Sequence, residues 1–171
     1  MRRGEPESGE EGVARPVPWE VAVKMLALRA RSAEEIRRAL ARRGYGREEI
    51  AAVLARLTAS RYLDDAEFAR TWVTTRARRA ALGPARLARE LRAKGIADAD
   101  IAVALRALAD EWDTADVARE AARRKLPSLQ GLPSGVARRR LAAFLERRGF
   151  SAEIILALCR AQDAGAENPY E

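Results

Sequence analysis

The sequence has no histidine and only one cysteine among its 171 residues. The absence of histidine excludes the common kinds of zinc site, the Ser-His-Asp and Cys-His nucleophile systems and the usual general base. One cysteine cannot build a disulfide framework, and the N-terminus has no hydrophobic segment typical of a secretory signal, so we expect a cytoplasmic protein. Because no apolar run approaches the ~18 residues of a membrane span, we expect no membrane contact.

Aromatic residues are also scarce, at 5% of the chain. Proteins that bind single strands usually stack bases on exposed aromatic side chains. Here most aromatics fall at positions that we predict to be core or helix ends, namely Tyr45, Phe68, Trp72, Phe144 and Phe150. Lysine is rare too, with three among 32 basic residues. Heavy use of arginine fits bidentate contacts to phosphate or carboxylate, although a GC-rich genome would give the same bias.

One short stretch occurs three times, from Leu40 to Leu54, from Leu91 to Leu105 and from Leu145 to Cys159. In each copy a leucine stands four residues before a glycine, an apolar residue follows the glycine, and an isoleucine comes six residues after it. This pattern predicts a helix, a glycine that ends it in the left-handed conformation, and a second helix. The spacings of 51 and 54 residues indicate tandem supersecondary units that stack on each other.

The sequence therefore predicts an all-α protein made of three tandem three-helix repeats, since no segment alternates with period two. Ser32 and Glu35 form a predicted capping box, Asp64 or Asp65 is expected to cap the fourth helix, and Pro84 to begin the fifth. We expect the first helix over residues 19–31 and the last over 151–161, with Trp112 as the apolar anchor of the third repeat. The expected organisation is a disordered N-terminal tail over residues 1–18, repeats over residues 19–61, 62–110 and 111–161, and an acidic C-terminal tail over residues 162–171.

Candidate catalytic groups are few. The adjacent carboxylates Asp64 and Asp65 are the acidic pair nearest a motif, and helix capping explains them. Cys159 occupies the position of Leu54 and Leu105 in the other copies, which favours a core residue over a reactive thiol. No glycine-rich phosphate loop is present. We therefore predict a protein that is not an enzyme and that uses no cofactor and no metal.

The net charge of +7 is distributed unevenly. Residues 1–18 carry −1 and the tail from Gln162 carries −3, so the segment 19–161 holds +11. Such a surplus attracts nucleic acid or an acidic protein surface, and pairing with nearby acids cannot cancel it. The candidate contact residues cluster on the three hairpins: Arg37, Arg38, Arg42, Arg43, Arg76, Arg78, Arg79, Arg86, Arg89, Lys94, Arg139, Arg140, Arg147 and Arg148.

Three motifs in one order carry a resemblance to a known family. They are YLDDAEFA from Tyr62, with Trp72 and Arg76 behind it, then G-P-x-x-L-x-x-E-L-x-x-K-G-I from Gly83, and RRLAAFLERRGFS from Arg139. Together they resemble the RecX family, the bacterial regulators of the RecA recombinase, over roughly residues 19–160. The resemblance implies a bent, elongated array of three three-helix repeats that lodges in the helical groove of RecA–DNA filaments and contacts more than one protomer. Gly46 departs from the family, which has an acidic helix cap there.

Two functions are open at this point. In the first, the chain is a non-enzymatic modulator, expected to be a monomer, that restrains RecA filament growth, ATP hydrolysis and strand exchange through arginines of all three hairpins. In the second, it is a nonspecific protein that binds single- or double-stranded DNA and competes for phosphates. Sequence-specific reading is disfavoured, because the second helix of each hairpin has alanine and aliphatic residues where base-reading side chains would be needed.

Overall fold

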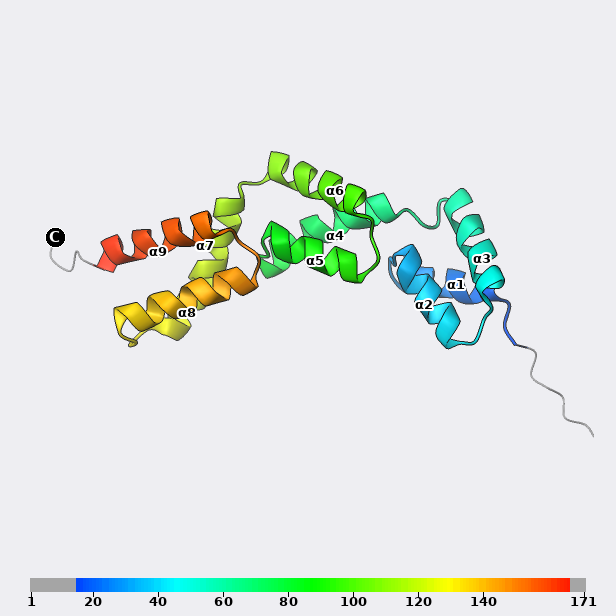
Figure 1. Cartoon of the computed structure of the whole chain (residues 1–171), viewed down its shortest axis with the longest axis horizontal. Helices are drawn as coiled ribbons and strands as arrows, with labels where there is room; N and C mark the ends of the chain where they lie inside the picture. The colour runs from blue at the N-terminus through cyan, green and yellow to red at the C-terminus, as the bar shows by residue number, and fades with distance from the viewer. Residues whose placement is uncertain (1–14, 167–171) are drawn as a thin grey trace, which may run out of the picture.

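The computed structural model describes the backbone of residues 15–166 and the side chains of residues 15–161. Within this part the chain is all-helical, and its helices form an elongated, arched array (Figure 1). The three repeats follow one another along the long axis, so the fold class predicted from the sequence is confirmed. None of the described helices has the length and the apolar character that crossing a membrane requires.

Each repeat contributes three α-helices to the array. Repeat 1 contains α1 (Pro18–Leu28), α2 (Ala33–Arg42) and α3 (Arg47–Ala59). Repeat 2 contains α4 (Asp65–Ala80), α5 (Pro84–Ala93) and α6 (Asp98–Glu111). Repeat 3 contains α7 (Thr114–Lys125), the short 3-10 helix η1 (Leu126–Leu129), α8 (Ser134–Arg147) and α9 (Ala152–Ala166).

Each repeat has its own hydrophobic core. The three clusters of buried residues follow the repeats, except at two connections, where Leu63 joins the cluster of repeat 1 and Ala81 joins that of repeat 3. The leucine or isoleucine pairs spaced by four residues on α2, α5 and α8 are fully buried, as their spacing predicts: Ile36 and Leu40, Leu87 and Leu91, Leu141 and Leu145. Burial of one such side chain contributes about 1.5–3 kcal/mol. The core of each repeat is therefore built mainly from contacts that are short in sequence.

The ends of the helices are set by local sequence. The capping box at Ser32 is present, with the Ser32 Oγ accepting from the Glu35 N–H and the Glu35 carboxylate accepting from the Ser32 N–H. Asp64 caps α4 by accepting from the Glu67 N–H at 2.8 Å, and Pro84 is the first residue of α5. These predictions are confirmed. At Gly46, where no side chain can cap, the Glu49 carboxylate accepts the Gly46 N–H at 2.7 Å.

The three hairpin glycines share one backbone conformation. Gly44, Gly95 and Gly149 have φ of +81°, +78° and +86°, which L-residues with a side chain rarely adopt. The apolar residue after each glycine is buried, and its N–H bonds back to the leucine five residues before it, as at Tyr45 and Leu40. This is the predicted glycine stop, and it turns the chain into the third helix of each repeat.

Four boundaries differ from the sequence predictions. The first helix ends at Leu28, because Arg29 is extended. Trp112 closes α6 and packs against the core of repeat 2, so its assignment as the anchor of repeat 3 is wrong. The segment from Leu126 to Gly135, whose prolines and glycines predict a loop, begins instead with the turn of η1. The last helix continues to Ala166, since Ala-rich sequence without proline can extend it.

The predicted tails lie mostly outside the described residues, which exclude 1–14 and 167–171. Arg15 and Pro16, the first described residues, contact repeat 1. The Arg15 guanidinium lies 3.5 Å from the centroid of the Tyr45 ring and donates to the Arg43 carbonyl, and the Tyr45 hydroxyl donates to the Pro16 carbonyl. The chain segment before α1 therefore packs on the first hairpin.

Candidate protein and nucleic-acid interface

The second helices of the three repeats lie end to end along the concave side of the arch (Figure 1). At one joint the Gly83 N–H, which precedes α5, donates to the Arg148 carbonyl that ends α8, at 2.8 Å. At the other joint the Ser32 Oγ, which caps α2, donates to the Lys94 carbonyl that ends α5, at 2.6 Å. The three helix dipoles therefore point the same way, and donors at the N-termini of α5 and α2 meet carbonyls at the C-termini of α8 and α5.

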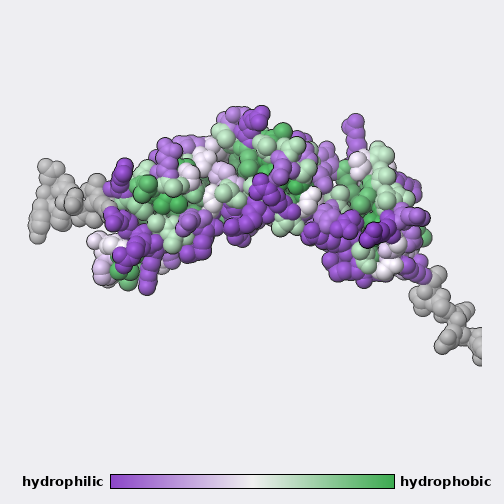
Figure 2. Space-filling view, in the orientation of Figure 1, coloured by the Kyte–Doolittle hydropathy of each residue, from purple (hydrophilic) through white to green (hydrophobic). Residues whose placement is uncertain are grey.

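This line of α8, α5 and α2, which we call the second-helix row, is strongly cationic. Counted from each helix start to its C-cap, the row carries 13 basic and four acidic residues, a net charge of +9. The lower margin of the molecule in Figure 2, where Figure 1 places these helices, is mainly hydrophilic. The net charge of the row, +9, is therefore higher than the net charge of the whole chain, +7.

The third helices carry the opposite charge. The line of α3, α6 and α9, which we call the third-helix row, occupies the convex side of the arch (Figure 1). It has four basic and eight acidic residues, a net charge of −4. A polyanion is attracted to one long side of the molecule and repelled by the other, so the charge distribution orients the chain on it.

The sequence of the chain matches known proteins along the same three units. The models of the RecX first, second and third three-helix domains match residues 19–57, 64–105 and 111–158. The chain belongs to the RecX family.

Among its relatives is the "Regulatory protein RecX" of Amycolatopsis mediterranei, 37% identical over 131 residues, or 77% of this chain and 74% of the relative. The protein of the same name from Halorhodospira halophila is 35% identical over 165 residues, or 94% of this chain and 98% of the relative. The crystal structure of RecX from Lactobacillus salivarius shares the fold, with a TM-score of 0.73 at 20% identity, over 86% of this chain and 95% of that chain.

In this RecX chain some of the predicted contact residues lie exposed on the second-helix row. Arg42, Arg89, Arg139, Arg140 and Arg147 are exposed, and within the described part of the chain they make no ion pair. They belong to α2, α5 and α8, so all three repeats contribute. These guanidinium groups are available for a partner.

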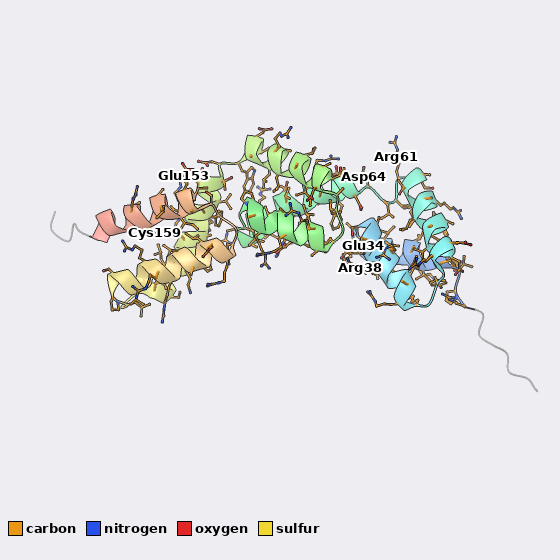
Figure 3. The ribbon with its side chains drawn as sticks, in the orientation of Figure 1. Glu34, Arg38, Arg61, Asp64, Glu153 and Cys159 are labelled. Carbon is orange, nitrogen blue, oxygen red and sulfur yellow. The ribbon has the colours of Figure 1, made fainter. Side chains whose placement is uncertain are left out.

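Two further predicted residues, Arg37 and Arg38, are exposed on the same row but share an acidic partner. The Glu34 carboxylate accepts from both guanidinium groups at 2.6 Å, and Figure 3 shows Glu34 and Arg38 together on α2. The hydrogen bond from Arg37 is the largest influence on the pKa of Glu34, which falls to about 2. Exposed pairs of this kind exchange readily for other anions, so both arginines can still contact a partner.

Arg86 and Arg43 of the row, and Arg76 of α4, make contacts within their own repeats. Glu90 accepts from Arg76 and Arg86 at 3.0 and 3.1 Å. Burial raises the pKa of Glu90, but these hydrogen bonds outweigh it and the net direction is down. Arg43 donates to the Ala39 carbonyl on its own helix.

Lys94 and Arg148, the C-caps of α5 and α8, join neighbouring repeats. The Lys94 ammonium lies 3.0 Å from the Glu35 carboxylate of repeat 1 and 4.2 Å from the centroid of the Trp72 ring. The Arg148 guanidinium donates to the Ala80 and Ala81 carbonyls of repeat 2. Burial lowers the pKa of Arg148. Both side chains therefore connect neighbouring repeats, and they are less accessible to a partner than the exposed arginines are.

Arg78 and Arg79 belong to α4 and not to the row. The Arg78 guanidinium lies 5.2 Å from the centroid of the Trp112 ring, and the Arg79 carbonyl accepts from Arg124. Sequence reasoning grouped them with the hairpin arginines because they are near in sequence. It also missed the acidic third-helix row, which the count of charges helix by helix would have found.

The three groups that the sequence analysis weighed as catalytic candidates, Asp64, Asp65 and Cys159, lie at helix ends or in a core. The Asp65 carboxylate accepts the Ala33 N–H of repeat 1 at 2.9 Å, while Asp64 caps α4 (Figure 3). Burial raises the pKa of Asp65. Cys159 is buried in the core of repeat 3, as its place in the repeat predicts. Among the described residues no group of His, Cys, Asp or Glu is arranged to hold a metal ion.

Proposed function

We propose that this chain is a non-enzymatic regulator that binds RecA–DNA filaments in the helical groove and restrains filament growth, ATP hydrolysis and strand exchange. The observation that carries the proposal is the separation of charge on an arched molecule, with +9 on the second-helix row and −4 on the third-helix row. A filament presents anionic and protein surfaces along a curved groove, and a long cationic row can contact several protomers at once. The regulatory names of the relatives support the same role.

The exposed arginines carry the contact in this proposal. Arg42, Arg89, Arg139, Arg140 and Arg147 make the primary contacts, and Arg37 and Arg38 join by exchanging Glu34 for an anionic group of the filament. Arg43, Arg76, Arg86, Lys94 and Arg148 act indirectly, by fixing the joints and the hairpins of the row. Because the contacts are distributed over all three repeats, no single substitution on the row is expected to abolish binding.

The test is a titration of the DNA-dependent ATPase of preformed RecA filaments. We expect inhibition at substoichiometric amounts of this chain, because one elongated molecule would contact several protomers at once. The control titrates the same DNA without RecA. If inhibition begins only when the free DNA is saturated with this chain, the proposal is wrong.

The second candidate, a nonspecific DNA-binding protein that competes for phosphates, is favoured by the same exposed arginines. Its binding would fall by about 0.7–0.9 log units per phosphate contact for each log unit of salt. The affinity of this chain for one DNA, measured once with the DNA bare and once with it coated by RecA, separates the two functions. An affinity that RecA does not change supports the second candidate.

A further inference from the structure

An open pocket lies between repeats 1 and 2. Its volume is about 660 Å³, and it is formed by the end of α1, the connection from α3 to α4, and α4. Its apolar wall includes Val23, Leu26, Tyr62, Phe68 and Trp72. We call this site the junction pocket. Figure 3 shows Arg61 and Asp64, which belong to its lining, on the connection between α3 and α4.

The apolar wall of the junction pocket is incompletely covered by the chain itself. Tyr62 is 57% exposed, and Trp72 is partly buried at the edge of the repeat 2 core. The two repeats meet here through polar bonds, such as those from Ser32 to Lys94 and from Ala33 to Asp65, and their hydrophobic cores are separate. An apolar side chain from another molecule would bury surface that the joint leaves open.

The charges on the rim are not balanced. Arg29 and Arg76 pair with Glu35 and Glu90, and Glu67 pairs with Arg70 outside the pocket. The Asp64 carboxylate, which also lines the pocket, accepts the Glu67 N–H as the cap of α4. Arg31 donates to the Met25 carbonyl and makes no ion pair with the residues that the structure describes. Arg61 is exposed and makes no side-chain hydrogen bond or ion pair in the described part of the chain. The rim thus presents two cations without carboxylate partners beside an apolar wall.

We propose that the junction pocket binds an acidic segment of the recombinase protomer, with one aliphatic or aromatic side chain inserted against Trp72 and carboxylates at Arg31 and Arg61. This inference rests on the proposed function and adds the surface through which protein, as distinct from DNA, is recognised. A stacked base fits less well, because Phe68 already stacks on Trp72 at 5.7 Å and the Lys94 ammonium also contacts that ring. An occupant that touches both repeats also fixes the angle between them.

The test fills the pocket without disturbing a core. Ala27 lines the pocket and is exposed on α1, so Ala27→Trp places an indole in it. The matched control is Ala52→Trp, on an exposed position of α3 outside the pocket. We expect Ala27→Trp to weaken binding to preformed RecA filaments by about tenfold, as the loss of a central anchor does, while Ala52→Trp leaves it unchanged. Affinity for the same DNA without RecA should not change in either variant.

A second pair of variants tests the Arg61 cation on the rim of the pocket. Arg61→Glu should weaken filament binding several-fold, and the control Arg106→Glu, the same charge change at an exposed position of α6, should not. Thermal unfolding followed by circular dichroism checks each fold. Filament binding that neither Ala27→Trp nor Arg61→Glu changes would overturn the inference. Equal loss of affinity for bare DNA would assign the pocket to nucleic acid instead, and failure of the unaltered chain to bind filaments would remove the proposed function and the inference together.

Discussion

Gly149 lies at the contact between repeats 2 and 3. A hairpin glycine there has two roles, since it adopts a positive φ and it lets the neighbouring repeat approach closely; comparing alanine substitutions at Gly149 and Gly44 separates them. A Cβ at Gly149 would lie 2.2 Å from the Arg86 N and 2.9 Å from its Cα. At Gly44, the equivalent glycine of repeat 1, the nearest atom to such a Cβ is the tip of the Arg15 side chain at 4.0 Å. Both residues have positive φ, so Gly44→Ala measures the backbone cost alone and Gly149→Ala adds the clash with repeat 2.

The expected magnitudes follow from these contacts. An alanine held in the left-handed region costs roughly 1–2 kcal/mol in either variant. In Gly149→Ala the hairpin must also move away from α5, which breaks the hydrogen bonds from the Gly83 N–H to the Arg148 carbonyl and from the Ala85 N–H to the Gly149 carbonyl. At about 1 kcal/mol for each bond, Gly149→Ala should lower the free energy of unfolding by roughly 3–4 kcal/mol.

Urea unfolding of both variants, followed by circular dichroism, measures the difference. We expect Gly149→Ala to be about 2 kcal/mol less stable than Gly44→Ala, with repeat 3 unfolding at lower urea than the rest because stability in repeat arrays is a sum of repeat and interface terms. Equal destabilisation by the two substitutions would refute the reasoning, since it would mean that the joint between repeats contributes nothing.

Further expectations concern the other joint and the charged rows. Ser32→Ala should lower the free energy of unfolding by about 1–3 kcal/mol in urea unfolding, because the buried hydroxyl both caps α2 and donates to Lys94; the control Ser151→Ala, at an exposed cap of α9, should cost less. Burial raises the pKa of Glu35, but hydrogen bonds from Arg29, Lys94 and the Ser32 N–H outweigh it and lower the pKa to about 2. A lowered pKa stabilises the fold at neutral pH, and this stabilisation should be lost as the pH falls from roughly 4 toward 2; the acid transition of Glu35→Gln should lack that component, and an unchanged transition would contradict the assignment. The triple variant Arg89→Glu, Arg139→Glu, Arg147→Glu should weaken filament binding by at least about tenfold, whereas Arg47→Glu, Arg106→Glu, Arg160→Glu, the same charge change on the third-helix row, should leave it nearly unchanged; similar losses in both would show that the rows are not distinguished.

The local structure of this protein was determined by its sequence. The leucine four residues before each hairpin glycine, as at Leu91 and Gly95, and the glycine itself predicted every second helix and its end, because these signals act over a few neighbouring residues. The cap at Asp64, the start at Pro84 and the buried Cys159 were predicted for the same reason. Trp112 was assigned to the wrong repeat, since its neighbours in sequence do not reveal which core is nearer.

The tertiary structure decided which basic side chains are available to bind a partner. Lys94 and Glu35 are 59 residues apart in sequence, and Arg148 and Ala80 are 68 apart, yet each pair is bonded across a joint. No local pattern separates Arg148, held by carbonyls, from its exposed neighbour Arg147. The end-to-end order of the second helices, the placement of the two charged rows on opposite sides of the arch and the junction pocket likewise exist only once the repeats are stacked. Sequence specifies each repeat because its contacts are short in range, while the binding surface is made by contacts between repeats.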